Sequence, residues 1–127
     1  MSGIQRVWAR ILVAALAMFL VFPVGSVFAQ DATVNMVGVS FSPTEMHVAP
    51  GATVQWVNTS TLQHTVTADD GSFDSGLVDP DGTFSMEFDT PGVYQYYCQP
   101  HGAAGLNGMS ATIIVDDPGA LAPAESD

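Results

Sequence analysis

Short runs of alternating apolar and polar residues follow one another from Thr33 to Val115, and no segment shows the period of an amphipathic helix. Residues two apart on a strand share a face, so each run presents one apolar face to a core. Pairs such as Asp81-Gly82 and Pro91-Gly92 separate the runs and predict turns. The pattern predicts an all-β sandwich or barrel of about seven to eight strands. The expected strands cover residues 33–41, 45–48, 53–58, 64–67, 83–88, 93–98 and 110–115.

The same alternation predicts which side chains face the core. Tyr94 and Tyr96 share a face with Cys98, and His64 shares a face with Val66. We therefore expect Cys98 and His64 to point inward from two different strands. A cysteine and a histidine on core-facing sides are able to meet, although they lie far apart in the sequence.

The first 29 residues have the features of a secretory signal peptide. Arg6 and Arg10 form a basic start, residues 11–24 are mostly apolar, and the small residues before Gln30 predict cleavage after Ala29. The protein is then exported, to a periplasmic or extracellular location. The alternative is an uncleaved membrane anchor formed by residues 11–29, although this run is about as short as a spanning helix can be.

Charge is distributed very unevenly between the leader and the rest of the chain. Both basic residues lie in residues 1–29, and all 13 acidic residues lie after them, so the mature chain has a formal charge of −13. Nucleic acid and anionic membranes are poor partners for such a surface, so we expect no nucleic-acid partner, and a basic protein partner is favoured. The acidic surface alternatively serves solubility in a saline habitat. We expect one domain over residues 30–116 and a flexible acidic tail over residues 117–127.

Cys98 is the only cysteine, and an exported chain cannot use a single thiol for an internal disulfide. His101 follows three residues later, and His64 and Met109 add an imidazole and a thioether. One thiolate, two imidazoles and a weak thioether suit a copper ion that cycles between two oxidation states. Zinc also binds cysteine and histidine, but it has no use for a weak thioether. The four residues predict one copper ion.

Four motifs of the chain carry a resemblance to a known family. They are Val54-Gln55-Trp56-Val57-Asn58, His64-Thr65-Val66, Pro91-Gly92-Val93-Tyr94-Gln95-Tyr96-Tyr97-Cys98-Gln99-Pro100-His101 and Gly108-Met109. With these motifs the chain resembles the plastocyanin-type cupredoxins from about Thr33 to Val115. The resemblance implies an eight-stranded Greek-key sandwich with a type 1 copper centre, in which His64, Cys98 and His101 are the equatorial ligands.

The axial ligand departs from the family pattern, which places a methionine five residues after the second histidine. That position holds Leu106, which has no donor atom, whereas Met109 lies eight residues after His101. If Met109 faces the core, residues 111, 113 and 115 continue an apolar row on the same face. If Leu106 does, the row becomes polar, which does not suit an inward face. We expect Met109 to be the axial ligand, across a loop three residues longer than the pattern. In the Leu106 register, copper would be three-coordinate or bound by a backbone oxygen.

The resemblance implies one-electron transfer, and we expect redox proteins as the partners. We also expect a monomer and no small-molecule substrate. An enzyme is not expected, because four protein ligands leave no open position at the metal and His47 is the only other histidine. The alternatives are a copper-binding module that delivers metal to an oxidase, and a β-sandwich interaction domain with an incidental thiol. His47 itself is expected on the surface, and Tyr97 is expected to face outward beside Cys98.

Overall fold

The computed structural model describes residues 31–119, which form eight strands and no helix. No described residue therefore belongs to a helix long and apolar enough to cross a membrane. The expected signal peptide lies outside this range, as does most of the expected tail. The strands are β1 (Ala32–Val37), β2 (Ser40–Ser42), β3 (Glu45–Val48), β4 (Ala52–Asn58), β5 (Thr67–Ala68), β6 (Thr83–Phe88), β7 (Gly92–Ala103) and β8 (Asn107–Val115).

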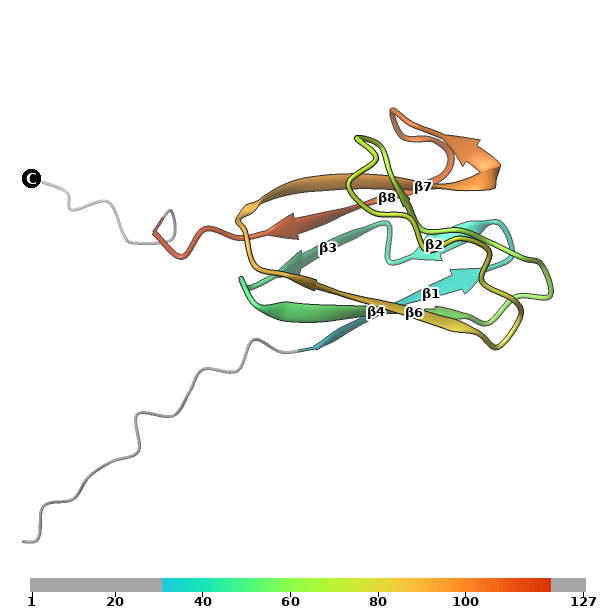
Figure 1. Ribbon diagram of the computed structural model, residues 1–127, viewed down its shortest axis with the longest axis horizontal. Coiled ribbons are helices and arrows are strands. Elements are labelled where there is room, and N and C mark those ends of the chain that lie inside the picture. Colours follow the sequence, from blue (N-terminus) through green and yellow to red (C-terminus); the bar gives the residue numbers. More distant parts are fainter. Residues whose placement is uncertain (1–30, 120–127) are drawn as a thin grey trace, which may run out of the picture.

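Two four-stranded sheets pack face to face, with β7 and β8 above β1, β4 and β6 in Figure 1. One sheet has the strand order β2-β1-β4-β6 and the other the order β3-β8-β7-β5. The pairs β1–β4 and β3–β8 are parallel, and the remaining pairs are antiparallel. The expected all-β sandwich is thus confirmed, with eight strands.

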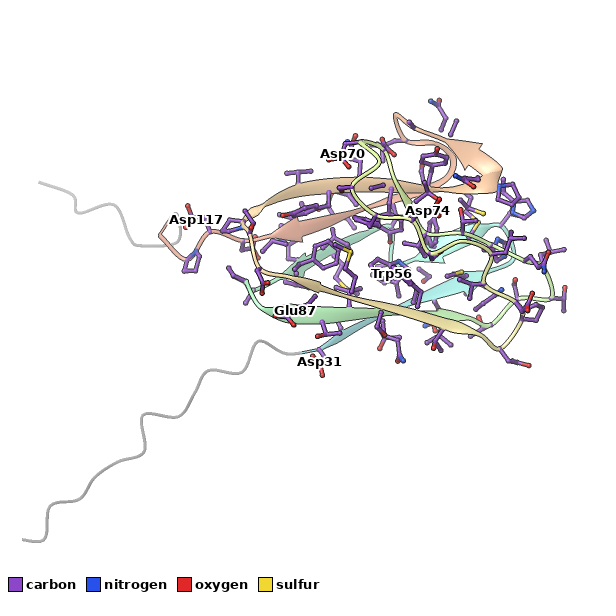
Figure 2. The ribbon with its side chains drawn as sticks, viewed as in Figure 1. Asp31, Trp56, Asp70, Asp74, Glu87 and Asp117 are labelled. Carbon is purple, nitrogen blue, oxygen red and sulfur yellow. The ribbon has the colours of Figure 1, made fainter. Side chains whose placement is uncertain are left out.

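Trp56 is the largest of the fully buried side chains and lies between the two sheets (Figure 2). Its ring is 5.4 Å from Tyr96 in an edge-to-face arrangement and 5.6 Å from Phe84. Each such aromatic pair contributes about 0.5–1.5 kcal/mol beyond the area it buries. The labelled acidic residues lie around the outside of the sandwich in Figure 2. The core thus joins the sheets, while the labelled acidic residues are exposed to water.

Five of the seven expected strands have different bounds, and two of these differ only in where they begin, β4 at Ala52 and β8 at Asn107. The first run is divided into β1 and β2, because Gly38 turns the chain with a φ of +58°. In the segment 64–67 only Thr67 belongs to a strand, and His64 makes an isolated bridge to Val78. Alternation fails there because residues 64–67 are all buried, so both sides of the segment are covered. The strand expected to end at Cys98 continues to Ala103.

The extension of β7 beyond Cys98 creates a β-bulge that positions the candidate site. β7 pairs with β8 up to Tyr97 opposite Ser110, and pairing resumes at Gly102 opposite Gly108. Between these two points β7 has residues 98–101, whereas β8 has Met109 alone. The ladder therefore bulges, and such bulges re-aim side chains. Beyond the bulge the two strands continue as a short hairpin, which rises from the upper sheet in Figure 1.

Candidate metal centre

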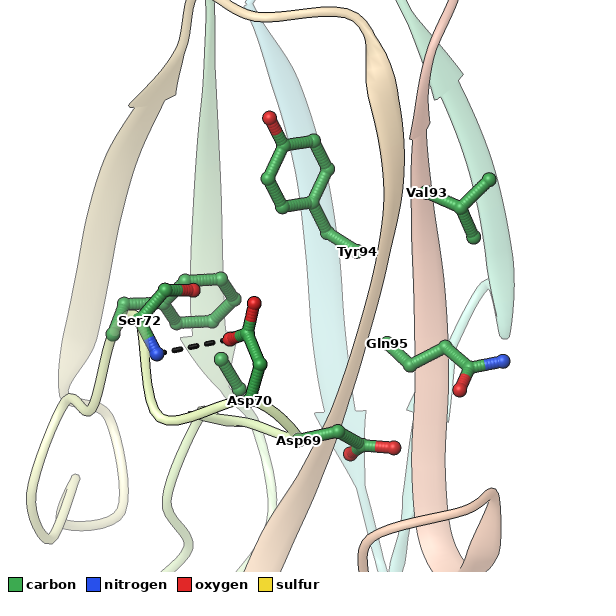
Figure 3. Close-up of a pocket in the computed structure, with 8 residues that line it drawn as sticks. Asp69, Asp70, Ser72, Val93, Tyr94 and Gln95 are labelled. Atoms are coloured by element: carbon green, nitrogen blue, oxygen red, sulfur yellow. Dashed lines mark hydrogen bonds between the residues drawn. The ribbon is translucent and has the colours of Figure 1, made fainter.

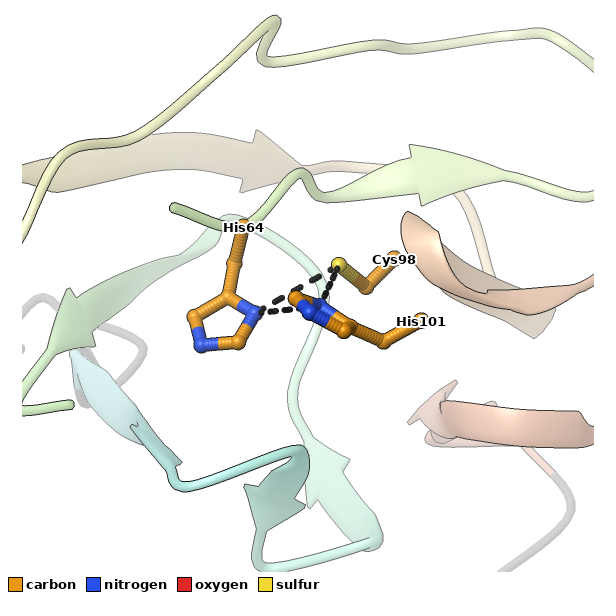
Figure 4. Close-up of side chains that lie close together, drawn as sticks. All are labelled: His64, Cys98 and His101. Carbon is orange, nitrogen blue, oxygen red and sulfur yellow. Dashed lines mark hydrogen bonds between the residues drawn. The ribbon is translucent and has the colours of Figure 1, made fainter. Parts of the chain in front are cut away.

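His64, Cys98 and His101 bring three donor atoms together at the hairpin end of the sandwich (Figure 4). The Nδ1 atoms of the two histidines are 3.1 Å apart. The Cys98 Sγ atom lies 3.5 Å from Nδ1 of His64 and 3.4 Å from Nδ1 of His101. The three atoms thus form a nearly equilateral triangle of one sulfur and two nitrogens.

The bulge explains how residues so close in sequence converge. Cys98 begins the bulge at the end of regular pairing, and its side chain is fully buried on the same face as Tyr96. His101 ends the bulge and is half-buried, so its ring reaches the same point from the solvent side. His64 comes from the segment before β5 and is fully buried. The predicted inward orientation of Cys98 and His64 is confirmed.

The triangle fits a metal ion in size and in chemistry. A triangle with these sides has its centre about 2 Å from each corner, and metal–nitrogen and metal–sulfur bonds are about 2.0–2.3 Å long. The lone pairs of three donor atoms this close together repel one another. A cation bound between the three atoms relieves this repulsion. A thiolate with two imidazoles is the donor set that Cu(I) and Cu(II) both accept.

The electrostatics of His64 favour its role as a neutral ligand. Burial, followed by the nearby ring of His101, lowers the pKa of His64 below its ordinary value, and the Gly38 backbone opposes this only in part. The ring is therefore neutral around pH 7, and a neutral imidazole has a free lone pair. Metal binding at this histidine requires no deprotonation.

Thr65 joins the two segments that supply the buried donors. Its backbone N–H donates a hydrogen bond to Cys98 Sγ at 3.4 Å, and its hydroxyl oxygen accepts one from the Gln99 N–H at 2.9 Å. The first bond stabilises negative charge on the sulfur, and the second fixes the strand on which the sulfur lies. Thr65 therefore holds Cys98 against the His64 segment.

Asn58 and Ser60 hold the loop that leads to His64. The Asn58 amide nitrogen donates to the carbonyl oxygens of Leu62 and Val78, at 2.7 and 3.0 Å. The Asn58 Oδ1 atom accepts from both the N–H and the hydroxyl of Ser60. The Ser60 hydroxyl lies 2.8 Å from Nε2 of His64. Asn58 thus holds the loop between β4 and His64 in place through these contacts.

The structure places the two axial candidates in different environments. Met109 is 2% exposed and is the single β8 residue opposite the bulge of β7. Leu106 is 50% exposed at the hairpin tip, where its φ of +60° is unusual for a residue other than glycine. The buried position of Met109 and its apolar row on β8 agree with the Met109 register.

The remaining histidine lies away from the cluster. His47 is exposed on β3, with Nδ1 2.9 Å from Asp116 and Nε2 3.4 Å from Glu45. The hydrogen bond that Asp116 accepts from the His47 ring, and then the Asp116 charge, raise the pKa of His47 above its ordinary value despite some desolvation. The prediction of a surface histidine without a part in the site is consistent with this position.

A cavity of about 330 Å³ lies beside β5 and β7 and shares no residue with the cluster (Figure 3). Asp70 at its rim accepts a hydrogen bond of 2.9 Å from the Ser72 N–H. The Ser72 hydroxyl and then this N–H lower the pKa of Asp70. The lining residues are Ala68, Asp69, Asp70, Ser72, Phe73, Val93, Tyr94 and Gln95.

Comparison with known proteins identifies the family. The profile of copper binding proteins of the plastocyanin/azurin family matches residues 28–116. The chain belongs to the plastocyanin/azurin family. A chloroplastic plastocyanin of Physcomitrium patens is 35% identical over 96 residues, which cover 64% of this chain and 57% of that protein. A chloroplastic plastocyanin of Hordeum vulgare is 34% identical over 119 residues, which cover 84% of this chain and 75% of that protein.

Solved structures show the same fold. The copper-containing nitrite reductase of Thermus scotoductus is 27% identical with a TM-score of 0.61, over 69% of this chain and 23% of the reductase. A purple cupredoxin of Nitrosopumilus maritimus is 22% identical with a TM-score of 0.59, over 68% of this chain and 100% of that chain. This plastocyanin/azurin-family chain therefore has the cupredoxin fold.

Membership of a copper-binding family, together with the positions of His64, Cys98 and His101, supports one copper ion as the cofactor. Sequence reasoning found these three residues and missed the contacts of Ser60 and Thr65. A serine four residues before a ligand, and a threonine directly after it, are weak signals in a sequence. Their contacts depend on how the loops fold back on one another.

Proposed function

We propose that this member of the plastocyanin/azurin family is an exported one-electron carrier in which His64, Cys98, His101 and Met109 hold one copper ion. The observation that carries the proposal is the triangle of one sulfur and two nitrogen atoms, with sides of 3.1–3.5 Å. Copper in such a site supplies a one-electron couple whose potential depends on the axial ligand. The burial of Met109 opposite the bulge supports it as that ligand.

The chain contributes rigidity and a route for the electron. Cys98 and His64 are fully buried and tied by hydrogen bonds, so their donor atoms need not move between the two oxidation states. His101 is the half-buried member of the four and offers its ring edge to a partner. Exposed residues 103–106 of the hairpin lie beside it, with Leu106 half-exposed. A redox protein that docks there comes close to the metal.

Replacement of Met109 by glutamine tests the axial position. An amide oxygen is a harder donor than a thioether and favours Cu(II), so we expect Met109→Gln to lower the reduction potential by about 60 mV or more. A tenfold change in preference corresponds to about 59 mV for one electron. Leu106→Gln is the matched control, since this side chain is 50% exposed at the hairpin tip. A spectral and potential shift in the Leu106 variant, with none in the Met109 variant, contradicts the assignment.

The acidic surface supports partners with a basic docking surface. We expect electron transfer to a basic cytochrome to slow by about tenfold or more between low salt and 1 M salt, where the Debye length falls to about 3 Å. An acidic cytochrome should show the opposite trend. Stopped-flow rates over a salt series make the comparison. Equal rates with both cytochromes at all salt concentrations would instead favour the surface as an adaptation to a saline habitat.

A second candidate is a copper-binding module that delivers metal to an oxidase. The half-buried position of His101 favours it, because one ligand edge is open to a receiving protein. The likeness to part of a copper-containing nitrite reductase fits a role beside a copper enzyme. Retention of copper against a competing chelator, together with reversible voltammetry, separates the candidates. A carrier keeps its ion through many cycles, whereas a donor loses it.

The domain organisation and location remain part of the proposal. Residues 1–29 form the export signal, residues 30–116 the copper domain and residues 117–127 an acidic tail. The family match to residues 28–116 supports the domain, and the composition of residues 1–29 supports export to a periplasmic or extracellular location. We propose that the protein acts as a monomer.

A further inference from the structure

Ser60 is the side chain that contacts the far nitrogen of the His64 ring. Nδ1 of His64 faces Cys98 and His101, and Nε2 on the opposite side lies 2.8 Å from the Ser60 hydroxyl. Ser60 is itself half-buried in the loop after β4. The contact is therefore partly shielded from water, and an internal hydrogen bond is not readily replaced by one to solvent.

The hydrogens in this network can be assigned from its neighbours. The Ser60 hydroxyl has one hydrogen and faces two acceptors, the Asn58 Oδ1 atom at 2.8 Å and the Leu62 carbonyl oxygen at 3.2 Å, so it donates to the closer Asn58 Oδ1. The Leu62 N–H donates to the same hydroxyl oxygen at 3.2 Å, and the oxygen has one lone pair left. That lone pair faces His64. Nε2 must then carry the hydrogen, which leaves the lone pair on Nδ1.

The assignment of Asn58 is fixed in turn by its own contacts. Its amide nitrogen faces two carbonyl oxygens, those of Leu62 and Val78, and its amide oxygen faces the N–H and hydroxyl of Ser60. A flipped amide would place nitrogen against a backbone N–H and oxygen against two carbonyl oxygens, which is unfavourable at all three contacts. Asn58 is fully buried, so these contacts cannot be exchanged for water.

We propose that Ser60 is a positioning residue for the metal centre: aligned by Asn58, its hydroxyl oxygen accepts the Nε2 hydrogen of His64 and so reserves Nδ1 for copper. The imidazole is then held in its ligand tautomer and orientation before the ion arrives. This inference rests on the proposed role of His64 as a copper ligand. It adds that a serine side chain sets the tautomer and the orientation of that ligand.

The contact between Ser60 and His64 also affects how strongly the His64 ring binds copper. A hydrogen bond from the far N–H to an acceptor makes an imidazole more basic, and loss of such partners typically costs about 10–100-fold in metal affinity. The more basic ring favours Cu(II) over Cu(I). Ser60→Ala should therefore weaken Cu(II) binding by about tenfold or more and raise the reduction potential. A tenfold loss confined to Cu(II) corresponds to a rise of about 59 mV.

The experiment compares three variants of the full chain. Ser60→Ala removes the hydroxyl, and Ser60→Thr keeps it. Thr59→Ala is the matched control, because the Thr59 hydroxyl donates to the Met36 carbonyl oxygen in the same loop and does not contact His64. Thermal unfolding first establishes that each variant folds. The readouts are the reduction potential, Cu(II) affinity by chelator competition, and the His64 tautomer by long-range proton–nitrogen spectra.

The tautomer is read in the metal-free protein at about pH 8, above the ordinary pKa of histidine. This measurement is independent of copper, so it tests Ser60 even if the proposed electron-carrier function fails. We expect His64 to hold the Nε2 hydrogen in the wild type and in Ser60→Thr, and to show both tautomers in Ser60→Ala. Unchanged tautomer and potential in Ser60→Ala overturn the proposal. An equal shift in Thr59→Ala also overturns it, because the effect would then be one of loop stability.

Discussion

Replacement of Cys98 by serine should abolish the blue colour and reduce Cu(II) affinity by more than 100-fold. The thiolate is the strongest donor of the cluster, and a serine hydroxyl stays protonated and binds copper weakly at neutral pH. Loss of a residue that only orients a ligand costs about 10–100-fold, so loss of the ligand itself should cost more. Optical titration with Cu(II) measures both effects.

The fold should survive this substitution. Cys98 is fully buried, but serine is similar in size and its oxygen can still accept the hydrogen bond from the Thr65 N–H. His47→Gln is the matched control, since it removes a histidine that lies away from the cluster. A Cys98→Ser protein that keeps the colour, or a His47→Gln protein that loses it, contradicts the proposed site.

Replacement of Gly102 by alanine should damage both stability and copper binding. A Cβ atom at this position would lie 2.6 Å from the Asn107 carbonyl oxygen and 2.7 and 2.8 Å from the backbone oxygen and nitrogen of Met109. All three are backbone atoms of the paired strand β8, so β7 and β8 have to move apart at the base of the hairpin, beside Gly102. We expect a loss of about 1–3 kcal/mol in the free energy of unfolding, as for other overpacked sites.

The site should be affected in the same variant, because the displaced strand carries Met109 and Gly102 directly follows His101. Gly92→Ala is the matched control on the same strand, where the nearest atom to a new Cβ is 3.6 Å away on the Tyr94 ring. Urea unfolding of the metal-free proteins and optical spectra of the copper-loaded proteins give the two results. Equal stability and identical spectra for Gly102→Ala and wild type would show that β7 and β8 are not tightly packed at Gly102.

The parity of residues along the strands was sufficient to predict the core-facing side of the sheets. Trp56 and Asn58 share a face and are both fully buried, and Tyr96 and Cys98 share another. Parity works here because each strand has one face in the core and one toward solvent. It also predicts Met109 as the buried residue, since only that register places an apolar row on the inner face of β8.

The same reasoning fails where a segment is covered on both sides or leaves the sandwich. Residues 64–67 are all buried, so alternation carries no information there. The hairpin beyond His101 consists of glycines, alanines, one asparagine and one leucine at a positive φ, and such a sequence shows no strand pattern. The contact between Ser60 and His64 depends on the loop conformation that Asn58 fixes, which a linear pattern does not contain.

The addition of Cu(II) to the purified protein tests the central claim most directly. If His64, Cys98 and His101 bind copper together, one equivalent should produce an intense blue colour that ascorbate bleaches, because a thiolate bound to Cu(II) absorbs strongly and Cu(I) does not. A protein that binds copper and stays colourless would contradict the claim, since the thiolate would then not be a ligand.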